Sequence, residues 1–468
     1  MIPRLFISIC LLATLPLSAA TLRVPTDFNE IETAMRSAEA GDTVLVAPGT
    51  YIEWTVPLVS GVTLLAEDME HGATVIHASD QSFVIVAEYV DATALIRGFT
   101  LRNATSSGIF LDTSDPVIED CLIIQNRGPE GGGALLWRSS AQFTRCRFSS
   151  NLADRGGAVY LRDIESQPIF TDCEFYWNTA WDLGGGIFVD RARPVFDNCV
   201  IFGNQSNGDG AGLYAENCLS GWPILDDCVL AKNHAFWRGG GAHFNYASGS
   251  LSGCTIVDNT ASIHSGGLWF LRSNAIVENS IIAFNAPSEG VVCGPFATPR
   301  FQCCDFYGNE GGDEICGADL GGNFISHPQF CDLDNNDWTL AANSPCLPLA
   351  SDCGLLIGAR GLGCSLPVGV SEVSPGIQAQ LSAFPNPFNP STEIRISLPE
   401  SGPLELSIFD IAGRRIRTLC SGTVLVAGEH SLRWKGRDNE DRPLPSGVYF
   451  LKLKAGGLEQ SRKLILLK

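Results

Sequence analysis

Basic residues are scarce in this chain of 468 residues, which has 31 Lys and Arg against 51 Asp and Glu. The formal charge of −20 argues against a nucleic-acid ligand, because binding to phosphates requires a basic surface. After the first twenty residues, the chain lacks any apolar run long enough to cross a membrane. Its 17 cysteines include no Cys-x-x-Cys pair and no zinc spacing with His, which argues against a metal cluster.

The charge is unevenly distributed along the chain. Residues 381–468 hold 13 Lys and Arg and 9 Asp and Glu, which leaves a formal charge of −24 for residues 1–380. Between these parts, the segment PVGVSEVSPGIQAQ (367–380) shows no hydrophobic periodicity. We therefore predict a separate C-terminal domain over 381–468, preceded by a linker over 367–380.

The first twenty residues have the pattern of a secretory signal peptide. Arg4 precedes an apolar stretch from Leu5 to Leu17, and the small residues Ser18, Ala19 and Ala20 follow it. An N-terminal membrane anchor is the alternative, but the apolar stretch is short for a bilayer. We therefore predict cleavage of residues 1–20 and an exported protein that is not transmembrane afterwards.

A short phrase recurs through the middle of the chain: an apolar residue, two variable positions, usually Cys, and an Asn five residues after that Cys. The asparagines are Asn103, Asn126, Asn151, Asn178, Asn204, Asn233, Asn259, Asn285 and Asn309. The cysteines are Cys121, Cys146, Cys173, Cys199, Cys228, Cys254 and Cys304. Spacings of 23 to 29 residues between the asparagines predict a solenoid in which each repeat is one coil.

Stacked coils bring equivalent residues to about one strand spacing, roughly 4.8 Å. Because an Asn side chain has both a donor and an acceptor, the asparagines are expected to bond to one another as a ladder. The cysteines are expected to pack inside as small apolar residues. A redox or metal role is the alternative, although adjacent coils lie too close for a series of disulfides. The residue three before the Cys position is apolar in every copy, and on one uninterrupted strand it cannot face inward together with the Cys. A corner or bulge is therefore predicted between them, while the apolar residue two after the Cys can share its interior face. Each coil is then expected to contain three strands.

The N-terminal segment reads VPTDFNEIETAM…GDTVLVAPGTY. Asp27 is expected to cap a short helix with the apolar face Ile31, Ala34, Met35 and Ala38, and residues 21–42 to cover the first coil. This segment resembles the entry of right-handed parallel β-helix proteins of the pectin-lyase-like superfamily. The resemblance implies an all-β fold, a right-handed parallel β-helix over 21–366.

The C-terminal part alternates short strands with Gly and Pro turns. The predicted strands are Glu393–Leu398, Leu404–Phe409, His430–Trp434, Gly447–Leu453 and Gln460–Leu467. The motifs PNPFNP from Pro385, FDIAGR from Phe409 and PSGVY from Pro445 resemble the flagellar-hook-capping-type Ig-like domain shared with type IX secretion sorting domains. The resemblance implies an Ig-like β-sandwich that engages a secretion machinery and a location outside a bacterial cell or on its outer-membrane surface. A module that only adds stability is the alternative.

Residues 286–366 form a Cys-rich exit from the solenoid. Its cysteines outside the repeat are Cys293, Cys303, Cys316, Cys331, Cys346, Cys353 and Cys364. In an exported protein these are disulfide candidates, with at least one left unpaired or paired with Cys218 or Cys420. Their connectivity stays open.

The pectin-lyase-like superfamily includes pectate lyases, polygalacturonases and pectin methylesterases, so the resemblance raises the question of an enzyme. The polygalacturonase pattern of Asn-Thr-Asp, Asp-Asp and Gly-His-Gly is absent. Catalytic residues are therefore not assigned. Asp332, Asp334 and Asn336 have the alternation of a calcium loop but lack its Gly and its final Glu, which favours a polar turn. No cofactor is predicted apart from this calcium candidate.

One residue per coil, two positions after the second Gly of each glycine strand, forms an aromatic column. Its members are Leu135, Val159, Phe188, Tyr214, His243 and Trp269. The last four are candidate glycan-facing residues if they point outward, and a self-stacking ladder is the favoured alternative. The sequence thus predicts a non-catalytic binding, adhesion or structural protein with a polysaccharide as candidate ligand. The alternative function is a polysaccharide lyase or glycoside hydrolase acting on polymers that contain uronic acid.

Overall fold

The computed structural model describes residues 19–78, 83–218 and 221–364 and, further on, residues 380–384, 386, 388, 391–398, 402–410, 414–425, 428–440, 442–455 and 458–466. The predicted signal peptide lies outside these residues apart from positions 19 and 20, and the predicted linker apart from position 380. The chain divides into two compact units, residues 1–366 and 367–468. No helix in the described part is long and apolar enough to span a bilayer.

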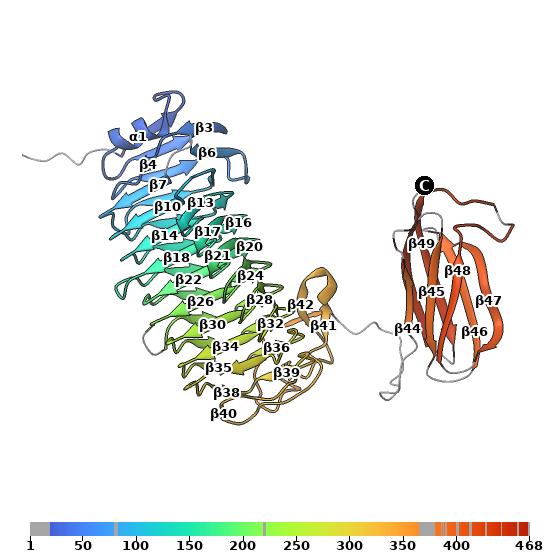
Figure 1. The fold of residues 1–468 in the computed structure, drawn as a ribbon. Helices are drawn as coiled ribbons and strands as arrows, with labels where there is room; N and C mark the ends of the chain where they lie inside the picture. The colour runs from blue at the N-terminus through green and yellow to red at the C-terminus, as the bar shows by residue number, and fades with distance from the viewer. Residues whose placement is uncertain are drawn as a thin grey trace, which may run out of the picture. The chain divides into compact units, whose positions relative to one another are not determined.

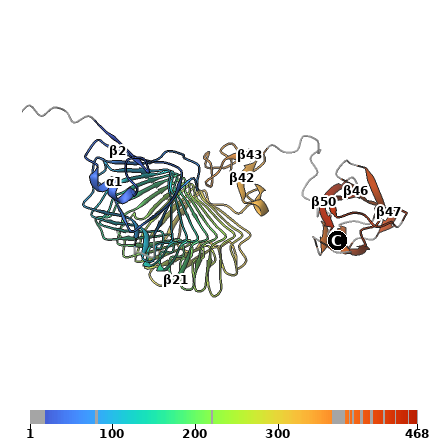
Figure 2. The same cartoon turned by 90° about the horizontal axis from the view of Figure 1, so that it is seen from above.

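The first unit is a solenoid of stacked coils, which are seen side-on in Figure 1 and along the stack in Figure 2. Four parallel sheets, named A to D below, run along the stack. A full coil passes through sheets A, B, D and C in that order before the next coil begins. The three strands predicted per coil are therefore four wherever sheet D is present.

The strands of each sheet follow in stacking order. Sheet A contains β1 (Thr21–Val24), β2 (Thr43–Val46), β5 (Thr63–Ala66), β8 (Leu95–Arg97), β11 (Val117–Glu119), β15 (Gln142–Thr144), β19 (Ile169–Thr171), β23 (Val195–Asp197), β27 (Ile224–Asp226), β31 (Ser250–Ser252), β35 (Ile276–Glu278), β38 (Arg300–Gln302) and β40 (Ala318–Asp319). Sheet B contains β3 (Gly49–Glu53), β6 (Thr74–Ala78), β9 (Thr100–Arg102), β12 (Leu122–Ile124), β16 (Arg147–Ser149), β20 (Glu174–Tyr176), β24 (Val200–Phe202), β28 (Val229–Ala231), β32 (Thr255–Val257), β36 (Ile281–Ala283) and β39 (Asp305–Tyr307). Sheet C contains β4 (Val56–Pro57), β7 (Phe83–Glu88), β10 (Ser107–Asp112), β14 (Ala134–Trp137), β18 (Val159–Arg162), β22 (Ile187–Asp190), β26 (Leu213–Glu216), β30 (Ala242–Asn245), β34 (Leu268–Leu271) and β37 (Val291–Cys293). Sheet D contains β13 (Arg127–Glu130), β17 (Leu152–Arg155), β21 (Thr179–Leu183), β25 (Gln205–Ser206), β29 (His234–Ala235) and β33 (Thr260–Ala261).

The corner predicted before each Cys is confirmed. Ile118 on β11 and Cys121 both point into the coil, and Asp120 between them has a φ of 51°. The left-handed conformation of that one residue turns the chain from sheet A to sheet B. Two residues after the Cys, Ile123 and Phe148 also lie in the interior, which is filled by apolar side chains stacked from coil to coil.

The asparagines from 126 to 309 form a continuous ladder at the corner after sheet B. Asn151 donates from both its N and its Nδ2 to Oδ1 of Asn178, each at 3.0 Å, and from Nδ2 to the Ile123 carbonyl at 2.9 Å. The pattern repeats in every coil of this series. A buried polar side chain is tolerated here because the next coil satisfies it.

Asn103 was predicted to belong to this ladder, and that prediction is wrong. The register pairs Thr100 with Leu122, so Ala104 is the residue equivalent to Asn126, and its N donates to Asn126 Oδ1 at 2.9 Å. Asn103 is exposed, with Nδ2 2.8 Å from His77 Nε2. The first copy of the phrase is displaced by one residue.

The seven repeat cysteines lie buried in the corners as free thiols. Cys228 Sγ, for example, donates to the Phe196 carbonyl of the preceding coil at 3.4 Å. Burial raises the pKa of the Cys199, Cys228 and Cys254 thiols well above the ordinary value. A buried thiol of raised pKa is a poor nucleophile, so Cys199, Cys228 and Cys254 serve to pack the corner.

A short helix, α1 (Ile31–Ser37), covers the N-terminal end of the stack and buries Ile31, Ala34 and Met35. Asp27 was expected to cap it, but the carboxylate of Glu53 on β3 does so instead. Glu53 accepts from Ile31 N at 2.8 Å and from Glu32 N at 3.3 Å. The cap is thus a contact from the next coil, which a local reading of the sequence cannot find.

The Cys-rich exit folds back over the outer face of sheet B. It contains β41 (Phe330–Asp332), the 3₁₀ helix η1 (Leu333–Asn335), β42 (Asp337–Ala341) and β43 (Leu362–Cys364). Trp338 packs there against Phe202, Val229 and Val257. Three disulfides, Cys293–Cys316, Cys303–Cys353 and Cys331–Cys364, hold this segment, and Cys346 is the unpaired cysteine.

The second unit contains two antiparallel sheets around a common apolar core. One sheet is formed by β44 (Gln380–Phe384), β45 (Thr392–Leu398) and β48 (Gly428–Trp434), and the other by β47 (Arg415–Leu425), β46 (Gly402–Asp410), β49 (Gly447–Ala455) and β50 (Leu458–Leu466). Asn386 of the first motif bonds to Lys463 O and Ile465 N, both at 2.8 Å, and Tyr449 donates to Pro445 O at 2.9 Å. These motif residues fix turns of the sandwich.

Candidate functional site

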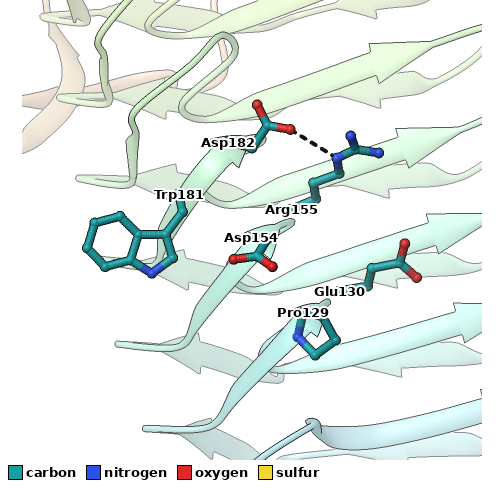
Figure 3. A pocket seen from close by; sticks show the side chains of 6 residues that line it. All are labelled: Pro129, Glu130, Asp154, Arg155, Trp181 and Asp182. Atoms are coloured by element: carbon teal, nitrogen blue, oxygen red, sulfur yellow. Dashed lines mark hydrogen bonds and ion pairs between the residues drawn. The ribbon is translucent and has the colours of Figure 1, made fainter.

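A concave surface lies on the arms, the segments that connect each ladder asparagine to sheet C. A groove of about 440 Å³ crosses the arms of three successive coils. It is lined by Pro129, Glu130, Asp154, Arg155, Trp181 and Asp182, which belong to β13, β17 and β21 (Figure 3). A continuation of the groove adds Thr105, Arg127, Gly128, Leu152 and Ala153.

Glycine positions the arms. Gly156 and Gly184 have φ values of 63° and 66°, in the left-handed region that a side chain disfavours. A Cβ on Gly156 would also lie 2.4 Å from the Val159 carbonyl oxygen. Each glycine therefore allows the arm to turn sharply into sheet C, and the residues before it project from the coil.

Trp181 is the prominent side chain of the groove. Strand alternation turns Ala180 into the solenoid, where it is buried, and Trp181 outward, where its side chain is 59% exposed. In Figure 3 the indole extends away from its strand. An exposed Trp beside charged groups can supply both stacking area and hydrogen bonds to a ligand.

The charged groups of the groove are partly paired. Arg155 Nε lies 3.1 Å from Asp182 Oδ2, and Arg162 Nη1 lies 3.9 Å from Glu130 Oε2. Asp154 has neither a hydrogen bond nor an ion pair within the described residues. It is the free carboxylate beside Trp181.

The aromatic column lies on the outer face of sheet C, next to the arms. Phe188, Tyr214, His243 and Trp269 are register partners on β22, β26, β30 and β34. Val159 was counted with them, but Tyr160 holds that register position, and Val159 points into the coil. The count failed because Ala158 replaces the third glycine of its coil.

These rings contact one another, stacked for Phe188–Tyr214 and edge-to-face for the other two pairs, and they are covered. Centroids lie 5.3 Å apart for Phe188–Tyr214, 5.0 Å for Tyr214–His243 and 6.3 Å for His243–Trp269. Trp269, the most accessible of the four, is only 9% exposed, and arginines of the arms lie over Phe188 and Trp269. Sugar stacking on this column stays a prediction that requires the arms to move.

The arms add a buried polar cluster behind the column. His243 Nδ1 lies 3.4 Å from Asp209 Oδ2, and burial lowers the pKa of His243 while Asp209 opposes that change. Burial raises the pKa of Tyr214 to about 12, although its hydroxyl accepts a bond from Asn245 Nδ2 at 3.1 Å. Neutral forms of these groups are thus favoured at pH 7.

Two carboxylates meet on the outer edge of sheet C. Asp190 on β22 and Glu216 on β26 are register partners, so their backbones lie about one strand spacing, roughly 4.8 Å, apart. Burial raises the pKa of Glu216, and the charge of Asp190 raises it further. Arg191 Nε donates a hydrogen bond to Asp190 Oδ1 at 3.1 Å.

The calcium candidate does not have the geometry of a cation site. Asp332 accepts from Asn335 N at 3.2 Å and from Asn335 Nδ2 at 2.6 Å. Asn336 Oδ1 accepts from the Lys232 ammonium at 2.6 Å, so a positive charge already occupies the place of a cation. No group of three or more His, Cys, Asp or Glu in the described part suits a metal.

Sequence reasoning missed the groove. The position three after each ladder asparagine varies freely, from Pro129 to Asp154 to Trp181. A signal was nevertheless present, because the residue before it is small in each coil of sheet D: Gly128, Ala153, Ala180, Ser206, Ala235 and Ala261. A small buried residue at that point places its successor on the surface.

Comparison with known proteins defines the class of both units. Residues 84–248 match the family model of the right handed beta helix region, and residues 388–458 match that of the FlgD Ig-like domain. The chain thus contains a right-handed β-helix region and a C-terminal FlgD Ig-like domain. No curated protein matches the sequence.

Among solved structures, similarity is distant. Pectate lyase Pel9A shares 15% identity and a TM-score of 0.44, over 71% of this chain and 90% of that chain. Latent PorU from Porphyromonas gingivalis shares 20% identity and a TM-score of 0.18, over 21% of this chain. PorZ, a surface component of the type-IX secretion system of the same organism, shares 19% identity and a TM-score of 0.15, over 19%. The chain spans about a tenth of PorU and PorZ, 10% and 11%.

Proposed function

We propose that this protein is an exported, non-catalytic glycan-binding protein whose binding face is the groove on the arms. The observation that carries the proposal is the 59% exposure of Trp181 within a groove that also offers Asp154, Arg155 and Glu130. A flat indole provides area for a sugar ring, and the charged side chains provide partners for hydroxyl groups. Two of the three carboxylates are held by arginines, which suits binding better than proton transfer.

The test compares two tryptophans of nearly equal exposure. Trp177, at 61%, lies on the same coil but does not line the groove. The full chain and its Trp181→Ala and Trp177→Ala variants are passed over immobilised polysaccharides. We expect Trp181→Ala to weaken retention at least tenfold and Trp177→Ala to leave it unchanged. Equal losses in both variants, or no retention of the parent chain, would contradict the proposal.

Export is the second part of the proposal. The sandwich resembles type IX secretion sorting domains in its motifs, and three disulfides in the exit segment suit an oxidising compartment outside the cytoplasm. Deletion of residues 381–468 is expected to keep the protein inside the cell envelope. Unchanged release into the medium would contradict an address function and favour a stabilising module.

A polysaccharide lyase or glycoside hydrolase is the second candidate function, favoured by the pair Asp190 and Glu216. Retaining glycosidases use two carboxyl groups about 5 Å apart, one of them with a raised pKa. Turnover of uronic-acid polymers, measured with and without calcium, tests this candidate. Cleavage that Glu216→Gln abolishes would establish an enzyme, whereas cleavage that persists in this variant would exclude the pair.

A further inference from the structure

The charges of the groove select among glycans, provided that the proposed binding function holds. The lining residues contain two cations, Arg127 and Arg155, and three carboxylates, Glu130, Asp154 and Asp182. The surface that a ligand meets therefore has no excess of positive charge. A polymer of uronate or sulfated sugars would need such an excess to offset its own charge.

Arg155 of the groove and Arg162, which is paired with a groove carboxylate, are already engaged on two sides. Arg155 is paired with Asp182, and its guanidinium lies 5.8 Å from the ring centroid of Phe188. Arg162 is paired with Glu130 and lies 5.4 Å from the ring of Trp137. Recruiting either arginine to a ligand carboxylate would leave Asp182 or Glu130 without its partner. The gain of one ion pair would then be offset by the loss of another.

Asp154 is the charge that a sugar on Trp181 meets first. It projects from β17, the strand next to β21 in sheet D, and it has no partner among the described residues. A carboxylate or sulfate held there would face a like charge, which disfavours binding. Sugar hydroxyls or a sugar ammonium could instead donate to its free oxygens.

The net charge of the first unit is negative, like that of Asp154. Residues 1–380 carry a formal charge of −24, so the solenoid repels a polyanion at long range when the ionic strength is low. Arg127 is the one groove cation without a carboxylate partner in the described part, and it stands against this negative background. One positive charge cannot reverse the preference.

We propose that the groove takes a glycan whose contacting sugars carry no carboxylate or sulfate group, that is, neutral or amino sugars. Stacking on Trp181 and hydrogen bonds to Asp154 and Arg155 are the shared recognition. Neutral and amino sugars differ in their contact with Asp154. An amino sugar is a cation that forms an ion pair with this carboxylate, whereas a neutral sugar only donates hydrogen bonds to it.

The experiment uses the full chain and defined polymers: a neutral β-glucan, chitosan, polygalacturonate and alginate. Retention is measured with EDTA at low and at moderate salt. We expect Trp181-dependent retention on the glucan or on chitosan and none on the two uronate polymers. Asp154→Asn identifies the source, since it weakens chitosan binding at least tenfold, with a loss of salt dependence, and changes glucan binding less than threefold.

A charge reversal gives the opposite readout. Asp154 is exposed and has no partner among the described residues, so the Asp154→Arg variant is expected to fold. This variant should be retained on polygalacturonate at low salt. Retention of the parent on a uronate polymer that Trp181→Ala abolishes would overturn the inference and leave the proposed function standing. Absence of retention on all four polymers would overturn both.

Discussion

Asp313 ends the asparagine ladder by taking the place of a further asparagine opposite Asn309. Its Oδ1 accepts from Asn309 N at 2.9 Å and from Asn309 Nδ2 at 2.8 Å, the same two bonds that each ladder asparagine accepts from the one before it. Its Oδ2 accepts from Gly308 N at 2.9 Å. A carboxylate has no donor to pass on, so the ladder stops there with its last amide satisfied.

Removal of this terminal acceptor should loosen the last coils. Asp313→Ala leaves the N and Nδ2 donors of the buried Asn309 without this acceptor, and each unsatisfied buried donor costs about 1–3 kcal/mol. We expect a lower denaturant midpoint and faster hydrogen exchange at residues 304–310. Asp313→Asn, which keeps one acceptor oxygen, should retain most of the stability, and equal losses in both variants would argue against the role of the acceptor.

An asparagine inside the ladder should matter more than its equivalent in sequence outside it. Asn204 accepts from Asn178 N at 2.9 Å and donates to Phe175 O at 2.9 Å and to Asn233 Oδ1 at 3.0 Å. Asn204→Ala interrupts bonds to both neighbouring coils, and we expect a loss of roughly 2–4 kcal/mol in the free energy of unfolding. Urea unfolding followed by circular dichroism measures it.

Asn103 provides the control, because it carries the same phrase but lies outside the ladder. Its φ of 66° suits glycine, so Asn103→Gly removes the side chain without backbone strain. The variant should change the free energy of unfolding by less than about 0.5 kcal/mol. A loss of stability as large as that of Asn204→Ala would show that Asn103 contributes as a ladder asparagine does.

The contrast between these asparagines shows what the sequence could predict. The scaffold was readable because every coil needs the same buried groups: an Asn that bonds to the next Asn, and a Cys small enough for the corner. The groove was not readable from chemistry alone, since Pro129, Asp154 and Trp181 share a position and nothing else. Surface positions are free of the stacking constraint, and that freedom removes the repeat signal.

Errors of register and long-range contact account for the rest. Counting from paired glycines misplaced Val159, because Ala158 stands where other coils have a third glycine. The strands Gln380–Phe384 and Arg415–Leu425 of the sandwich were missed, and the cap on α1 depends on Glu53, 22 residues after Ile31. The return of the exit segment over sheet B rests on contacts such as Arg360 Nη1 to Asn198 Oδ1 at 2.8 Å, far apart in sequence.

The stability of the exit segment should depend on pH through Asp305. This residue is fully buried, and burial raises its pKa to about 7, although Ser326 N donates to Oδ1 at 3.0 Å and Cys346 Sγ lies 3.3 Å from Oδ2. In the unfolded chain an Asp titrates near 3.9. Between about pH 4 and pH 7 the folded state therefore binds more protons, so this contribution to stability is complete below pH 4 and is lost as pH rises through 7.

Asp305→Asn isolates this effect from other titrating groups such as His243. We expect the parent chain to lose stability relative to the variant between pH 5 and pH 8, by a few kcal/mol at ~1.4 kcal/mol per pKa unit. Urea midpoints at both pH values, taken as the difference between the two proteins, give the result. A difference that is independent of pH would show that Asp305 is ionised in the folded protein.

The Cys331–Cys364 disulfide should keep the exit segment on sheet B. It closes a loop with a sequence separation of 33, for which the chain-entropy model gives a stabilisation of about 3–4 kcal/mol. Cys331→Ser combined with Cys364→Ser should expose Trp338 and the apolar residues Phe202, Val229 and Val257 beneath it, while the coils keep their own ladder. Limited proteolysis should then cut first within residues 326–364, and the remaining solenoid should persist.

Cys420→Ser, in the other unit, is the control and should leave the digestion pattern unchanged. Simultaneous digestion of the whole solenoid would show that the exit segment and the coils unfold together.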